Sequence, residues 1–162
     1  MKIPDAITPV VGYRSWSVGM GRLWSPRGPS RVRWPRRGAL RARCLKHGDP
    51  NPFHPAMKPT DRHDAPQPDC SCGIYAMREP WDIEAVPVTP PWGVVIGRVD
   101  GWGRVVLGRK GWRAELVRPV ELFADPSWNE PTRSEMNAVA KMYGLPLRWE
   151  ILTLEHSDRA SA

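Results

Sequence analysis

Acidic residues are missing from a long stretch of this 162-residue chain. None occurs between Ala6 and Gly48, although the whole chain has 17 and the same stretch is rich in arginine. Such asymmetry is typical of a surface that contacts phosphates or an acidic protein. Arginine outnumbers lysine 19 to 5, which a GC-rich genome would also produce. Codon bias explains the choice of arginine but not the missing carboxylates, so both interpretations stay open.

Cysteines and long apolar runs are also scarce. The chain has three cysteines, and no apolar run approaches the roughly 18 residues that a membrane-spanning helix needs. The N-terminal residues lack the apolar core of a signal peptide. We therefore expect a cytoplasmic protein without a membrane partner, and we do not expect a structural disulfide. In a reducing compartment the cysteines are expected to bind a metal or to remain free thiols.

Proline and tryptophan are abundant instead, with 19 and 9 residues. The prolines disfavour long helices, and the tryptophans disfavour disorder because they supply large buried areas. The chain is 41% hydrophobic and 25% charged, as globular proteins are. We predict a single domain over residues 1–154, followed by a frayed tail over residues 155–162.

The front of the chain, residues 10–48, reads as a basic β section. Alternating β-branched, aromatic and polar residues predict strands at 10–18, 22–24, 32–34 and 39–45. These strands would form a small antiparallel sheet with an arginine-rich face. Residues 49–76 follow as a proline-rich loop without periodicity, and such a loop inside a compact domain needs a clamp.

Residues 92–123 read as a β-meander. Val94–Val99 and Trp102–Leu107 flank Asp100-Gly101, a pair that favours a two-residue hairpin turn. Gly108–Gly111 predicts a second turn, and a third strand follows at 112–117. Pro119 is expected to interrupt that strand before it continues at 120–123. A tightly turned meander of this kind resembles an SH3-like barrel.

One helix is predicted over residues 132–143. Thr132 and Glu135 have the spacing of a capping box, and Gly144 is expected to end the helix. Its apolar stripe consists of Met136, Val139, Ala140 and Tyr143. Residues 147–154 could add a strand. The fold class is therefore mainly β, with small antiparallel sheets or an SH3-like barrel, one C-terminal helix and a clamped proline-rich loop.

The clamp is a set of metal ligands. Cys44, Cys70 and Cys72 are all the cysteines in the chain, and histidines lie near them in sequence. Three cysteines and one histidine complete the tetrahedral ligand shell of a structural zinc ion. On spacing alone the histidine can be His47, His54 or His63. The alternative is that the three cysteines are reduced, half-buried thiols.

A resemblance favours His63. The segment His63-x-Ala-Pro-x3-Cys70-x-Cys72-Gly-Ile-Tyr-Ala76 is similar to one in small proteins of high-GC Gram-positive bacteria and their phages. Those proteins also look alike at residues 12–16, at Trp102-Gly103 and at residues 111–115. That group has no assigned activity. The resemblance implies a shared fold and a retained Cys/His cluster of Cys44, His63, Cys70 and Cys72, and nothing about a reaction.

Motifs of catalysis are missing. The chain has no H-E-x-x-H, P-loop, G-x-S-x-G or dinucleotide fingerprint, so we expect no enzyme and no small-molecule substrate. A zinc- or thiol-dependent enzyme is the distant alternative. The first hypothesis is a zinc-stabilised module that binds an acidic protein, encoded by a phage and acting on a host factor. The second is a nucleic-acid-binding protein whose arginines contact phosphates and whose tryptophans stack on bases. The residues expected to contact the partner are Arg22, Arg31, Arg33, Trp34, Arg36 and Arg37.

Overall fold

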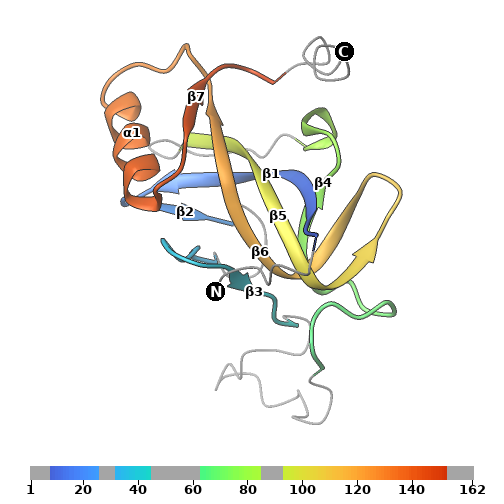
Figure 1. Ribbon diagram of the computed structural model, residues 1–162. Coiled ribbons are helices and arrows are strands. Elements are labelled where there is room, and N and C mark those ends of the chain that lie inside the picture. Colours follow the sequence, from blue (N-terminus) through green and yellow to red (C-terminus); the bar gives the residue numbers. More distant parts are fainter. Residues whose placement is uncertain (1–7, 26–31, 45–62, 85–92, 153–162) are drawn as a thin grey trace, which may run out of the picture.

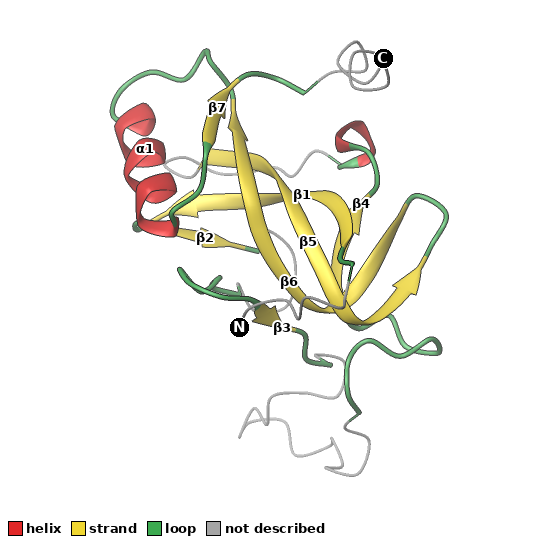
Figure 2. Cartoon of the chain, viewed as in Figure 1, coloured by secondary structure: helices red, strands yellow, loops and turns green. Residues whose placement is uncertain are grey.

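The computed structural model describes residues 8–25, 32–44, 63–84 and 93–152 (Figure 1). This part of the chain is mainly β, as predicted, with one seven-stranded sheet and one α-helix (Figure 2). The elements are β1 (Val10–Gly19), β2 (Arg22–Trp24), β3 (Leu40–Arg41), β4 (Ile74–Met77), a 3-10 turn (Pro80–Asp82), β5 (Gly93–Leu107), β6 (Gly111–Ala124), α1 (Thr132–Tyr143) and β7 (Leu147–Trp149).

Four strands pair in a closed circuit. β1 pairs with β5, β5 with β6, β6 with β4, and β4 with β1, all antiparallel. β2 extends the sheet beyond β1, and β3 and β7 both pair with β6. Because β7 runs parallel to β6, the sheet is mixed. The structure therefore has one mixed sheet in place of the small antiparallel sheets that were expected.

The core is one cluster of buried side chains from these strands and from α1. Trp16 on β1, Leu122 on β6 and Met136 on α1 are fully buried members of this cluster. The apolar stripe predicted for the helix is the face that it buries. Figure 1 shows α1 packed beside β7 and the ends of β1 and β2. The described part of the β section over residues 10–48 and the long strands β5 and β6 therefore share one core.

The hairpin predicted at Asp100-Gly101 is wrong, because β5 runs straight through these residues. Asp100 pairs with Val11 on one side and with Arg118 on the other, so β5 is enclosed by two strands and cannot reverse there. Gly101 serves a close approach instead of a turn. A Cβ atom at this position would lie 2.4 Å from the ring of Trp112. The chain reverses only at residues 108–110, where the second turn was predicted.

The predicted interruption at Pro119 is also wrong, because β6 is continuous from Gly111 to Ala124. Pro119 lies opposite Val99, beside a register shift in the pairing of β5 with β6. A bulge is one of the few places where a strand tolerates a residue without an amide N–H. β4 was not predicted at all, since its four residues follow the cysteines without a turn signal before them.

In the front section, the first two predicted strands are confirmed as β1 and β2. The third, over residues 32–34, is wrong as a strand, because it is reduced to a bridge between Trp24 and Arg33. Pro35 ends it, since proline cannot donate to a ladder. The fourth, predicted over 39–45, is only the two-residue β3.

The two ends of α1 differ in how well they were predicted. The helix spans Thr132–Tyr143 and ends at Gly144 in the left-handed conformation, as expected. The capping box is wrong, because Thr132 is already helical and Pro131 stands at the cap without a side-chain hydrogen bond. The carboxylate of Glu130 takes that role and accepts hydrogen bonds from the N–H and the hydroxyl of Ser134. β7 is shorter than the predicted strand over 147–154, and residues 153–162 lie outside the described residues.

Candidate metal centre

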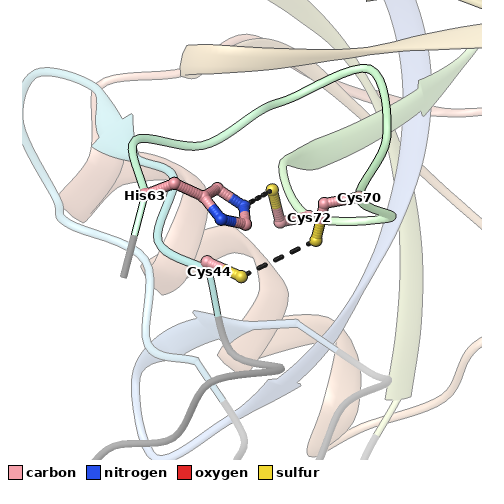
Figure 3. Close-up of side chains that lie close together, drawn as sticks. All are labelled: Cys44, His63, Cys70 and Cys72. Atoms are coloured by element: carbon pink, nitrogen blue, oxygen red, sulfur yellow. Dashed lines mark hydrogen bonds between the residues drawn. The ribbon is translucent and has the colours of Figure 1, made fainter. Parts of the chain in front are cut away.

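Two separate stretches of chain, residues 40–44 and 63–73, bring together Cys44, His63, Cys70 and Cys72. Each offers one ligand atom, and these four atoms all lie within 4.8 Å of one another. In Figure 3 the four side chains point toward a common centre. Cys44 Sγ lies 3.7 Å from Cys70 Sγ, and His63 Nε2 lies 3.2 Å from Cys72 Sγ. This arrangement can hold a metal ion.

The separations are close to those of a tetrahedral site. With metal–sulfur bonds of about 2.3 Å, two sulfur ligands of a tetrahedral ion lie about 3.8 Å apart. A nitrogen ligand at about 2.0 Å lies about 3.5 Å from each sulfur. The Cys44–Cys70 and His63–Cys72 pairs are near these values. The three thiols are not in disulfides, so all of them are available as ligands.

Strand β6 positions both halves of the cluster. β3 pairs with it through Leu40 and Arg41, and the N–H of Ala42 donates to the carbonyl of Glu115 at 2.7 Å. Cys44 follows two residues later. The other ligands lie in the loop over residues 63–73, which runs directly into β4, and β4 pairs with the first half of the same strand. The cluster therefore joins β3 to the loop that precedes β4.

Two arginines from the β5–β6 hairpin clamp this loop by its carbonyl groups. Arg113 Nη1 donates to the carbonyls of Cys70 and Cys72, the latter at 2.7 Å, and its Nη2 donates to that of Pro68 at 3.2 Å. Arg104 Nη1 donates to the carbonyls of Asp64 at 3.1 Å and Pro66 at 3.3 Å. A guanidinium group has several donors in one plane, so each arginine can fix two or three carbonyls at once. Sequence reasoning missed both residues, because neither lies near the ligands in sequence.

Glycine is required immediately after the last ligand. Gly73 has a φ of 121°, a conformation that side chains rarely adopt. A Cβ atom there would also lie 2.9 Å from Pro66 Cβ and 3.2 Å from Arg113 Cβ. The loop therefore passes close to the arginine that clamps it.

Cys72 favours its protonated thiol form when no cation is bound. Burial raises the pKa of the Cys72 thiol, and a backbone hydrogen bond from Gln67 opposes this effect only in part. A hydrogen bond with Cys70 and repulsion from Cys70 and Cys44 raise the pKa further. The side chain is only 7% exposed, so water does little to solvate a thiolate there. A metal ion that binds must displace the proton, and it then supplies the positive charge that three converging sulfur atoms need.

We predict that Arg113→Ala destabilises the loop over residues 63–73. The substitution leaves the carbonyls of Pro68, Cys70 and Cys72 without their donor, and losing hydrogen bonds to a charged group costs about 1.5–3 kcal/mol. Urea unfolding should show this loss, and metal affinity should fall with it. Arg109→Ala is the matched control, because Arg109 is an exposed arginine of the same hairpin. Equal stability and metal affinity in the two variants would contradict the clamp.

The other predicted site residues are distributed as follows. His63 lies in the cluster, whereas His47 and His54 lie outside the described residues. Of the residues expected to contact a partner, Arg33, Arg36 and Arg37 are exposed and Arg22 is half-buried, while Arg31 lies outside the described residues. Trp34 is fully buried, so it belongs to the core and not to a contact surface.

These observations define a mainly β chain with a Cys3His cluster that can hold a metal ion. Comparisons with models of protein families, with curated proteins and with solved structures found no match. Within the described ranges, no helix is long and apolar enough to cross a membrane.

Proposed function

We propose that the protein is a non-enzymatic binding module that a structural zinc ion stabilises and that contacts an acidic protein partner. The observation that carries this proposal is the convergence of Cys44, His63, Cys70 and Cys72 within 4.8 Å. Three thiolates and an imidazole favour zinc over magnesium or calcium, which prefer oxygen ligands. Because zinc-thiolate sites need reduced cysteines, the proposal includes a cytoplasmic location.

The number of ligands supports a structural and not a catalytic role. Catalytic zinc sites have three protein ligands and leave the fourth position to water or substrate. Here four side chains converge, and all four positions of a tetrahedral ion would be filled. The zinc ion would act as a staple between β3 and the loop before β4, where the described chain has few buried apolar side chains. Binding free energy would then serve as folding free energy.

The sheet pairing supports the SH3-like interpretation. β1, β5, β6 and β4 pair in a closed circuit, which leaves none of these four strands as a free edge. Such barrels bind partners through their loops and remaining edges. We propose that this fold and the Cys/His cluster are shared with the small proteins of high-GC Gram-positive bacteria and their phages that the sequence resembles.

The buried tryptophans favour a protein partner over a nucleic acid. Trp16 and Trp34 are fully buried, so the alternation of arginine and tryptophan in the front section is not a row of exposed stacking rings. Arg33, Arg36 and Arg37 stay exposed, and in the described part of the chain no carboxylate forms an ion pair with them. Exposed arginines without stacking partners fit electrostatic steering toward an acidic protein surface.

Metal analysis of the purified protein tests the zinc site. We expect one zinc ion per chain, and cobalt substitution should give the absorption spectrum of tetrahedral thiolate coordination. His63→Ala should weaken metal binding, whereas His47→Ala and His54→Ala should not. The proposal would be overturned if the protein, purified under reducing conditions, contains no metal and does not bind added zinc. Loss of zinc in the His47 variant alone would assign the fourth ligand to that residue.

A further inference from the structure

An exposed methionine occupies a position that methionine does not favour. Met20 lies in the two-residue turn between β1 and β2 with a φ of 54°, and Gly21 follows with a φ of 67°. Turns with two positive φ angles favour asparagine, aspartate and glycine. The side chain of Met20 is 79% exposed, more than any other large apolar side chain among the described residues. Neither core packing nor turn chemistry therefore explains a methionine here.

A second methionine and an arginine meet this turn from other parts of the chain. A Cβ atom on Gly21 would lie 3.2 Å from Met142 Cε and 3.7 Å from Arg36 Nη2. Arg36 Nη2 also donates to the Gly21 carbonyl at 3.4 Å. Met142 is 39% exposed and lies in the last turn of α1. We call Met20, Gly21, Arg36 and Met142 the methionine patch.

One buried tyrosine fixes the three segments that form the methionine patch. The Tyr143 hydroxyl accepts a hydrogen bond from the Leu23 N–H at 3.1 Å and donates one to the Trp34 carbonyl at 2.9 Å. It thereby ties α1 to β2 and to the segment before Arg36. Because these segments are held before any partner arrives, little backbone conformational entropy is lost when the patch binds.

The charged residues next to the patch members in sequence are all basic. Arg22, Arg37 and Lys141 flank its members in sequence, and residues 8–44 contain no acidic residue. The single carboxylate within α1 is Glu135 in its first turn, at the far end from Met142. In the described part of the chain, neither Arg36 nor Arg37 forms an ion pair. The patch is an apolar spot with a basic rim.

We infer that the methionine patch is the docking surface for an acidic segment of a protein partner, one that places an apolar side chain between Met20 and Met142. Methionine is flexible and polarizable, and it is frequent at surfaces that accommodate apolar side chains. The basic rim selects flanking carboxylates. This inference rests on the proposed binding function and deepens it, because it names the surface and the chemistry of the partner.

The test uses the zinc-loaded protein with isotope-labelled methionine methyl groups. The probe is a short synthetic peptide in which glutamate alternates with leucine, and two control peptides replace glutamate with lysine or leucine with serine. We expect the first peptide alone to shift the Met20 and Met142 methyl resonances, in a saturable way that salt weakens. The methyl group of fully buried Met136 should not shift.

Met20→Gly separates a binding role from a structural one. Glycine accepts a positive φ without strain, so this variant should melt at a higher temperature than the natural chain. Peptide affinity should nevertheless fall about tenfold or more, since the exposed side chain is lost. Leu107→Ser is the control, because Leu107 is 66% exposed on the β5–β6 hairpin, away from the patch, and should leave affinity unchanged (Figure 1).

Three results would overturn the inference. The first is the absence of shifts at Met20 and Met142 with the glutamate–leucine peptide. The second is an equal response to the glutamate–serine peptide, which would show that charge alone binds. The third is a shift of the same resonances by a single-stranded oligonucleotide, which would assign the surface to nucleic acid. Zinc content is measured in the same samples, so failure of the metal site is recognised separately.

Discussion

Replacement of Cys72 by serine is expected to release the metal and to unfold the loop over residues 63–73. Cys72 is the most buried thiol of the cluster, and its sulfur atom lies 3.2 Å from His63 Nε2. A metal present at a thousand times its dissociation constant stabilises a protein by about 4 kcal/mol, and this contribution would be lost. Urea unfolding of the zinc-loaded chain and of the variant measures the difference.

The loss should be local at first. The core cluster includes Trp16, Leu122 and Met136, none of which is a ligand, so the sheet and α1 should persist. Hydrogen exchange is the appropriate readout, because it reports opening segment by segment. The amide of Cys70, which donates to the Gln67 carbonyl at 3.2 Å, should lose its protection, while the amides of β5 and β6 keep theirs.

Two controls accompany this prediction. Ser71→Ala changes an exposed residue between Cys70 and Cys72. The backbone carbonyl of Ser71, and not its hydroxyl, accepts a hydrogen bond from the Tyr75 hydroxyl. The substitution should therefore leave metal binding unchanged. A chelator added to the natural chain should reproduce the effect of Cys72→Ser. If neither the chelator nor the substitution changes stability or exchange, the cluster consists of three reduced thiols and a histidine without a metal ion, and the proposed zinc staple is wrong.

Sequence reasoning located the cysteines of the candidate metal centre because the chain has only three, and the resemblance favoured His63 as the histidine beside them. With only Cys44, Cys70 and Cys72 to consider, the Cys/His set could be named before its geometry was known. The apolar stripe of α1 could also be predicted, because a period of 3.6 residues is a local property. The residues that hold the ligands in place could not, since Arg104 and Arg113 reach the loop from strands about 40 residues away.

The long strands show why local signals failed elsewhere. Asp100-Gly101 has the composition of a hairpin turn, but β1 and β6 enclose β5 on both sides and hold it extended. The packing of Trp112 onto Gly101 is a contact between strands, which no short-range pattern contains. Trp34 was misplaced for a similar reason. Its arginine neighbours suggested a surface, whereas its burial depends on Trp16 and Tyr143 from distant parts of the chain.

Trp34→Ala is expected to be among the most destabilising substitutions in the described part of the chain. Removing a buried tryptophan typically costs about 3–5 kcal/mol, because apolar contacts are lost and a cavity remains. Trp34 is fully buried, its ring packs edge-on against Trp16 at 5.3 Å, and its indole N–H donates to the Ser25 hydroxyl at 2.9 Å.

A half-buried charge adds to this cost. The Arg14 guanidinium lies 4.7 Å from the Trp34 ring, and burial lowers the pKa of Arg14 to about 10, so it stays charged at neutral pH. Its Nη1 donates to the Tyr75 carbonyl at 2.9 Å, but its Nε is buried without a hydrogen-bond partner among the described residues. Trp34→Ala removes the closer of the two cation–π contacts of Arg14 and leaves Ser25 with Arg14 Nη2, at 3.4 Å, as its hydrogen-bond donor. Trp34→Phe keeps an aromatic ring and should recover part of the loss.

The same variants decide between a core and a surface role for this residue. Replacing a tryptophan that stacks on a base or a partner lowers the affinity for that partner, while the stability of the protein stays nearly the same. A core tryptophan lowers stability first. Arg33→Ala is the matched control, because Arg33 is exposed. Substitution of an exposed side chain usually changes the free energy of unfolding by less than about 0.5 kcal/mol. If urea unfolding shows that Trp34→Ala lowers the free energy of unfolding as little as Arg33→Ala does, Trp34 is not a core residue. It then becomes available again as a stacking residue for the nucleic-acid hypothesis.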